Sequence, residues 1–287
     1  MTSAGDAGGA AGAAGAGPRI DGSGTPRARC VLAPNPGLMT LDGTNTWLVA
    51  EPGSGTVVVV DPGPDDEGHL QRVASLARQA GQRIAAIVLT HGHEDHSGGA
   101  ARLAGLTGAP VRAVDPAHRL GDEGLPPGAV VTASGCEIEV VATPGHTADS
   151  VSLYLRADGA VLTGDTVLGR GTTVIAGDGS LADYLGSLDR LRALADERQL
   201  TALLPGHGPM LASPLGVLDF YIQHRAERLA EIRAALAAGD RTRPQIVARV
   251  YADVDQALWP FAEISVQAQL AYLDSLGELP PGMPAAG

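Results

Sequence analysis

The sequence predicts a mixed α/β domain at residues 27–213, followed by a small helical domain at residues 215–280. The length of 287 residues, 44% of them hydrophobic, is enough for one large core with a small appendage. As far as residue 213, short β-branched runs alternate with stretches of helical periodicity, which is typical of an α/β domain. After Pro214 the composition changes to long helical patterns.

The first half of the α/β domain begins with a strand that ends before the turn at 35–37. The β-branched run Thr56–Val60 predicts a buried strand, and residues 69–80 have apolar residues at helical spacing. In order, this half is expected to contain strands at 28–34, 45–50, 56–60, 84–90 and 111–114, and helices at 69–80 and 97–106.

The second half consists of alternating segments joined by Gly-containing turns, and one strongly periodic helix. Its strands are expected at 130–134, 137–142, 150–155, 160–162 and 202–204, and its helix at 181–196. The small domain is expected to hold three helices. The first spans 217–238, the second opens with Thr242 as its cap and Pro244 in its first turn, and the third spans 265–276.

Composition limits the function. Residues 1–26 are rich in Gly and Ala and are expected to form a flexible tail, with a second tail at 281–287. Because we find no secretory signal and no apolar run long enough to span a membrane, we expect a cytoplasmic protein without a membrane partner. The net charge of −12 disfavours a polyanionic partner. Cys30 and Cys136 fit no C-x-x-C pattern and are expected to be inert thiols.

The segment His91-Gly92-His93-Glu94-Asp95-His96 directly follows the strand expected at 84–90. Three imidazoles and a carboxylate at the end of a strand are a ready ligand set for a divalent transition metal. The side chain of Glu94 should point away from this set. Further coordinating side chains follow other strands, on or beside Gly-containing loops that can meet at one sheet edge: Asp61, His146, Asp165 and His207.

These residues divide into two expected metal sites. His91, His93 and His146 would form an all-nitrogen site, and Asp95, His96 and His207 a mixed one, with Asp165 bridging the two ions. Two Zn²⁺ per chain are expected, although Fe or Mn would also suit these ligands. Zinc ionises bound water near neutral pH, so a bridging hydroxide can act as the nucleophile, and Asp95 and Asp165 are the candidate catalytic carboxylates.

Other polar residues near these loops have expected roles of their own. Asp61 is expected to accept a hydrogen bond from a ligand histidine and so fix its tautomer. Thr90 and Thr147 either orient ligands in the same way or cap turns. His69 and His118 have no comparable context and are expected at the surface.

In these motifs the chain resembles the metallo-β-lactamase superfamily, whose five motifs occur in the same order. The resemblance implies a four-layer αββα sandwich with a dinuclear site at one edge. Zinc β-lactamases typically have Cys where this chain has Asp165, so the chain looks more like the glyoxalase II and related hydrolase branches. His93 replaces the Glu of the flavodiiron branch, which disfavours redox chemistry. A mononuclear iron dioxygenase shares much of the motif set.

Three segments resemble the beta-lactamase-like protein 2 group more narrowly: 35–49, 169–174 and 221–225. The resemblance implies that the helical segment at 215–280 is a winged-helix-like domain. Members of that group and a related branch include a mitochondrial single-strand endoribonuclease and thioesterases that act on polyketide carrier proteins.

We therefore expect a dinuclear zinc hydrolase of an ester, thioester or related bond in a small or carrier-bound substrate. The alternatives are a single-strand-preferring endoribonuclease, and an iron dioxygenase or non-catalytic metal-binding protein. RNA is less favoured as a partner because only 3% of residues are aromatic and the helix expected at 265–276 lacks Arg. Candidate substrate-binding residues are Asn45, Arg170, His224 and Arg225. The oligomeric state stays open.

Overall fold

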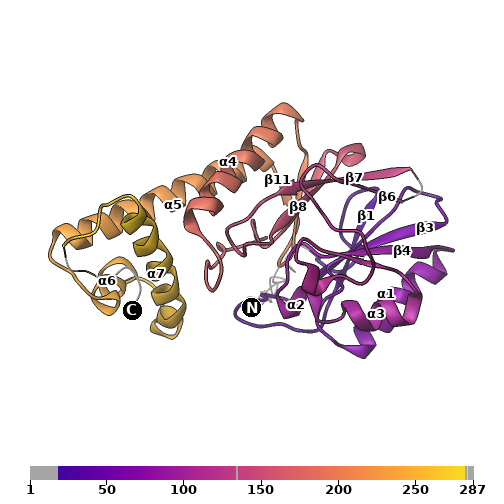
Figure 1. Ribbon diagram of the computed structural model, residues 1–287, viewed down its shortest axis with the longest axis horizontal. Helices are drawn as coiled ribbons and strands as arrows, with labels where there is room; N and C mark the ends of the chain where they lie inside the picture. Colours follow the sequence, from indigo (N-terminus) through magenta and orange to yellow (C-terminus); the bar gives the residue numbers. More distant parts are fainter. Residues whose placement is uncertain (1–18, 134, 282, 284–287) are drawn as a thin grey trace, which may run out of the picture.

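The computed structural model describes residues 19–133, 135–281 and 283, and its strands form two sheets (Figure 1). The first sheet has the order β1-β2-β3-β4-β5, antiparallel from β1 to β3 and parallel from β3 to β5. Its strands are β1 (Ala28–Leu32), β2 (Asn45–Val49), β3 (Thr56–Val60), β4 (Arg83–Val88) and β5 (Val111–Arg112).

The second sheet has the order β11-β10-β9-β8-β7-β6, in which only the β9–β10 pair is parallel. Its strands are β6 (Val130–Ala133), β7 (Cys136–Ala142), β8 (Val151–Leu155), β9 (Ala160–Gly164), β10 (Ala202–Pro205) and β11 (Leu211–Ala212). The sequence patterns predicted every strand except β11, whose two residues are too few to carry a period.

Three apolar clusters separate four layers. Within β3, Val58 and Val60 face the space between the two sheets, whereas Val57 and Val59 face helices α1 (Glu67–Gln79) and α3 (Ala100–Thr107). This alternation follows from the two-residue period of a strand. A third cluster packs the outer face of the second sheet against α4 (Leu181–Glu197) and α5 (Pro214–Ala237). The layers therefore run helix, sheet, sheet, helix, which confirms the αββα sandwich.

The small C-terminal lobe consists of the far part of α5 together with α6 (Arg243–Val250) and α7 (Trp259–Ser275), and it lies away from the sheets (Figure 1). A capping box between Thr242 and Gln245 begins α6, as the predicted cap requires. The predicted domain boundary at 213–215 falls where α5 begins. Because α5 packs on α4 as well as on α6, that boundary stays a prediction.

Part of the predicted N-terminal tail packs on the sandwich. The predicted tail residues 1–18 lie outside the described part of the chain, but residues 19–26 contact the sandwich. Asp21 accepts a hydrogen bond from the backbone of Leu32, and Thr25 donates one to Asp158. The predicted C-terminal tail is described only at 281 and 283. Among the described residues, no helix is both long and apolar enough to cross a membrane.

Candidate metal centre

The predicted ligands meet at one edge of the sandwich, each on a loop that follows a strand. Asp61 follows β3, His91 and His93 follow β4, and the short helix α2 (Glu94–Ser97) carries Asp95 and His96. The remaining ligands follow three strands of the second sheet: His146 after β7, Asp165 after β9 and His207 after β10. Residues far apart in the sequence are thus brought together by the packing of the two sheets against each other.

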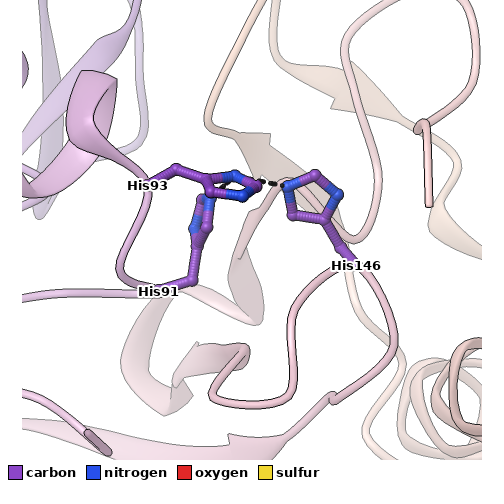
Figure 2. A group of neighbouring side chains, drawn as sticks. All are labelled: His91, His93 and His146. Atoms are coloured by element: carbon purple, nitrogen blue, oxygen red, sulfur yellow. Dashed lines mark hydrogen bonds between the residues drawn. The ribbon is translucent and has the colours of Figure 1, made fainter. Parts of the chain in front are cut away.

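One group consists of three imidazoles that point toward one another (Figure 2). The Nδ1 atom of His93 lies 3.1 Å from Nε2 of His91 and 3.0 Å from Nε2 of His146. In a tetrahedral site with Zn–N bonds of about 2.0–2.1 Å, two ligand nitrogens lie about 3.4 Å apart. The three nitrogens therefore have nearly the separation that one shared ion requires.

A second group consists of Asp95, His96 and His207. Nε2 of His207 lies 3.1 Å from Nε2 of His96 and 3.1 Å from Oδ2 of Asp95. His96 and His207 are fully buried, and the Asp95 side chain is partly open. This group also fits one ion, with a carboxylate in place of the third imidazole.

Asp165 lies between the two groups. Its Oδ2 atom is 3.7 Å from Nε2 of His146 and 3.4 Å from Nε2 of His207, one residue from each group. Its Oδ1 atom is buried without a hydrogen-bond partner. Although burial opposes ionisation, His96 and His207 hold the pKa of the Asp165 carboxyl well below its usual value. A charged, unsatisfied buried oxygen is costly unless a cation binds it, so the carboxylate fits a bridging ligand.

The outer nitrogen of four imidazoles is held by an oxygen. The Nδ1 atom of His96 donates to Oδ2 of Asp61 over 2.9 Å, and that of His146 donates to the carbonyl of Val174 over 2.8 Å. The Nδ1 atom of His207 likewise faces the carbonyl of Gly43, and that of His91 faces the hydroxyl of Thr90. With the proton fixed on Nδ1, the Nε2 lone pair points inward, as metal binding requires.

Asp61 connects these supports. Its Oδ1 atom accepts from the backbone of Thr90, and its Oδ2 atom accepts from the Thr90 hydroxyl and from His96. Its φ of 50° lies in the left-handed region, which is costly for a residue other than Gly. The buried Asp61 carboxylate thus bonds to both Thr90 and His96, and its predicted role in fixing the tautomer of a metal ligand stays a prediction.

At two of the imidazoles, burial also favours ligation. Burial lowers the pKa of His91 well below its usual value and lowers that of His146. Both rings are therefore neutral at pH 7, the form that binds metal. At His96 and His207, by contrast, the Asp165 carboxylate outweighs burial and raises the pKa, to about 9 for His207. Glu94 is exposed, as predicted.

For Thr147 the structure shows the second of the two predicted alternatives, because its hydroxyl bonds to Asp149 and Ser150 and holds the turn after His146. Two other predicted placements differ from the structure. Asn45 is fully buried and does not line a cleft. Its amide donates to the carbonyls of residues 205 and 208 and so fixes the loop that carries His207. His69 is also buried, with Nε2 2.9 Å from the Thr46 hydroxyl, because α1 turns this residue inward beside Leu70.

Some groups that shape the centre could not be predicted from the sequence. The Val174 and Gly43 carbonyls that hold ligand rings are backbone groups, which residue type cannot reveal. Gly206 is the clearer case, because a Cβ there would lie 2.5 Å from Oδ1 of Asp165 and 2.7 Å from Cε1 of His96. Only Gly fits against the ligands at this point, and its position directly before His207 was the available signal.

A pocket of about 480 Å³ opens from the centre toward the C-terminal lobe. His146 and Asp165 line its inner end, and α7 supplies Phe261 and Ala262 on the far side. Most of the lining is apolar, including Leu38, Met39, Leu41, Leu168, Val174, Tyr251, Val254 and Leu258. The predicted substrate residues Arg170, His224 and Arg225 also line it, and Arg170 pairs with Asp42.

A second pocket, of about 460 Å³, opens from the centre on the side of His93. Its polar lining consists of His93, Asp115, His118, Thr147, Asp149 and Asp178. His118, predicted at the surface, is half-buried here. We refer to the two spaces as the apolar pocket and the acidic pocket.

Comparison with known proteins identifies the family. Residues 39–207 match the model of the metallo-beta-lactamase superfamily, and residues 242–278 match that of the beta-lactamase associated winged helix domain. The chain belongs to the metallo-beta-lactamase superfamily. It is 31% identical over 268 residues to a Beta-lactamase-like protein 2 homolog of Drosophila melanogaster, an alignment that covers 87% of this chain and 88% of that protein.

Other members of the superfamily are similar over most of the chain. An atrochrysone carboxyl ACP thioesterase of Aspergillus fumigatus is 32% identical over 217 residues, which cover 74% of this chain and 62% of that protein. A metallo-beta-lactamase family protein of Thermus thermophilus has the same fold, with a TM-score of 0.73 at 22% identity over 91% of this chain and 97% of that one. With its His/Asp clusters able to hold metal, this superfamily member is a metal-dependent hydrolase.

Proposed function

We propose that the protein hydrolyses a thioester or ester whose acyl group lies in the apolar pocket, with two zinc ions at the centre. His91, His93 and His146 would hold one ion, Asp95, His96 and His207 the other, and Asp165 both. The observation that carries the proposal is the continuity between a largely apolar pocket and two of these ligands, His146 and Asp165.

The lining of this pocket favours an acyl substrate over RNA. Each methylene buried there stabilises the bound substrate by about 0.8 kcal/mol. A single-strand nuclease needs a basic groove with stacking aromatics. Here Arg170 is paired with Asp42 and Arg228 with Glu231, and the chain carries a net charge of −12. The similarity to a thioesterase supports the same choice.

The chain's own residues would have distinct parts in the reaction. Bound zinc would supply an ionised water and polarise the substrate carbonyl. The Asp61 and Thr90 side chains keep the ligand rings in the tautomer that binds metal. Asp95 has a side chain 29% exposed, against 11% for Asp165, so it is the better placed carboxylate to accept a proton from the attacking water. The apolar walls exclude bulk water around the acyl group.

The test uses purified protein of measured metal content and three substrates: a medium-chain acyl thioester of pantetheine, the matching oxygen ester, and single-stranded RNA. We expect two zinc ions per chain and the highest kcat/KM on the thioester. Asp165→Asn should lower kcat/KM by about 1,000-fold or more, because it removes the bridging charge. Asp189→Asn, an exposed carboxylate on α4, is the matched control and should leave activity unchanged.

Two results would contradict the proposal. Efficient cleavage of RNA without thioester hydrolysis would make the protein a nuclease. A single iron per chain, with no hydrolysis of either acyl substrate, would favour the dioxygenase alternative.

A further inference from the structure

Arg225 is a buried cation in the wall of the apolar pocket. It lies on α5, is 5% exposed, and lines the pocket together with His146 and Asp165. Its guanidinium carbon lies 4.9 Å from the centre of the Tyr184 ring, and one nitrogen donates to the carbonyl of Thr173. Neither of these two contact groups carries a negative charge.

The other arginines of the pocket differ in this respect. Arg228 pairs with Glu231 and lies over the Tyr251 ring, and Arg170 pairs with Asp42. Among the described residues, no carboxylate pairs with Arg225, and its Nε atom is buried without a hydrogen-bond partner. A buried charge with so few partners costs several kcal/mol. The fold therefore keeps a cation where an apolar residue would be more stable, which points to a ligand.

The surroundings limit what this ligand can be. A guanidinium presents parallel N–H groups that match the two oxygens of a carboxylate. A phosphate dianion would need a second free cation, and the neighbouring Arg170 and Arg228 are already paired. The rest of the lining is largely apolar. A group with one negative charge on an otherwise apolar chain satisfies both features.

We propose that Arg225 binds a carboxylate carried by the acyl part of the substrate, so that the enzyme prefers acyl groups with a second, free carboxylate. This inference rests on the proposed hydrolase function and names its substrate class. The scissile carbonyl would lie at the inner end of the pocket, near His146 and Asp165. The free carboxylate would lie farther along the wall, at Arg225.

Arg225 also has a purely structural explanation that the test must separate. By donating to the Thr173 carbonyl it holds a residue whose hydroxyl bonds to the backbone of Asp165. If Arg225 only supported Asp165 in this way, its loss would affect every substrate equally, because the support acts on the metal centre. A binding role affects only substrates that carry the carboxylate, so the ratio of two kcat/KM values distinguishes the two.

The experiment compares two pantetheine thioesters of equal chain length, one ending in a carboxylate and one in a methyl ester. For the wild type we expect kcat/KM to be at least about 10-fold higher for the carboxylate. In Arg225→Gln it should fall about 100-fold for the carboxylate and less than about 3-fold for the methyl ester. Arg192→Gln, an exposed arginine of α4 that pairs with Asp219 of α5 and lines neither pocket, is the control and should change neither.

A second measurement needs no catalysis. The free dicarboxylic acid is titrated calorimetrically into protein stripped of metal with a chelator. We expect saturable binding to the wild type and at least about 10-fold weaker binding to Arg225→Gln. Should this variant not fold, Arg225→Lys keeps the positive charge without the paired N–H donors of the guanidinium. It should lose part of the preference for the carboxylate thioester.

The outcomes separate this inference from the proposed function. Diacid binding that depends on Arg225, with no thioester hydrolysis, would overturn the hydrolase proposal and leave the carboxylate site standing. Hydrolysis with equal rates on both thioesters, or an equal loss on both in Arg225→Gln, would overturn the carboxylate site alone. Stronger binding of a 5′-phosphorylated oligonucleotide than of the diacid would also overturn it.

Discussion

The two pockets that open from the metal centre are nearly equal in volume and opposite in chemistry. The apolar pocket, about 480 Å³, combines aliphatic and aromatic walls with Arg170, Arg225 and Arg228. The acidic pocket, about 460 Å³, carries Asp115, Asp149 and Asp178. The same ligand cluster is therefore approached from one side by apolar surface with positive charge and from the other by negative charge. This difference gives an anionic, apolar substrate only one favourable direction of approach.

A third side of the centre is closed. Asp61 and Thr90 form buried bonds behind the ligands, and His69 lies behind them against Thr46. Neither pocket includes these residues. The polar groups on this side bond to one another inside the protein, whereas the polar groups of the two pockets line open space. Each of the three sides can be altered separately.

The closed side gives the largest expected change in free energy. Burial lowers the pKa of His69 to about 4, against 6.5 for a free histidine, and the nearby Arg72 lowers it further while Asp66 raises it. Between these two pKa values the unfolded chain binds the proton and the folded chain does not. The stability that depends on His69 is therefore complete above pH 6.5 and is lost as the pH drops toward 4, by up to about 3 kcal/mol.

His69→Gln removes this titration, so the variant should lose less stability between pH 7 and pH 4.5 than the wild type does. Urea unfolding of chelator-treated protein at pH 7 and pH 4.5 measures the effect without interference from bound metal. His118→Gln, in the acidic pocket, is the matched control and should keep the wild-type dependence. Equal pH dependence in wild type and His69→Gln would show that the third side is open to water.

Filling each pocket in turn tests which one the substrate uses. Ser265→Trp places an indole in the apolar pocket from α7, and Ala148→Trp does the same in the acidic pocket. If the indole excludes about three methylenes of the acyl chain, at about 0.8 kcal/mol each, kcat/KM should fall about 50-fold in Ser265→Trp. Ala148→Trp should change it less than about 3-fold. A larger loss in Ala148→Trp would reverse the assignment of the pockets.

The sequence predicted the parts of the centre that depend on local spacing. The cluster at residues 91–96 is visible because it follows directly on a strand, and the other ligands repeat that pattern. The residues that hold the ligands in place can be predicted only where they lie close to a ligand in the sequence. Thr90 precedes a ligand and was identified, whereas the two carbonyls bonded by Asn45 lie 160 and 163 residues away, so its role could not be predicted.

The pockets depend even more on long-range packing. His224 and Arg225 were predicted as one pair, but adjacent helix residues point in directions about 100° apart. The His224 ring stacks on Phe220 at the pocket wall, while Arg225 is buried against Thr173. The acidic pocket gathers Asp115, Asp149 and Asp178 from three separate loops, so no motif marks it. The net charge of −12 belongs to the whole chain and does not predict the sign of the charge at the opening of either pocket.

The smallest expected effect concerns the long-range charge of the acidic pocket. Asp178→Asn removes one exposed negative charge at that opening and touches no ligand. If the field of Asp178 repels anionic substrates, its removal should raise kcat/KM for the carboxylate thioester by about 2-fold at low ionic strength. The value should return to that of the wild type near 0.5 M salt. The methyl ester thioester, which lacks the charge, should not respond. The Asp178 carboxylate also accepts a hydrogen bond from the backbone of Ala148. An equal change on both thioesters, or a change that persists in salt, would mean that the substitution altered this turn and not the electrostatic field.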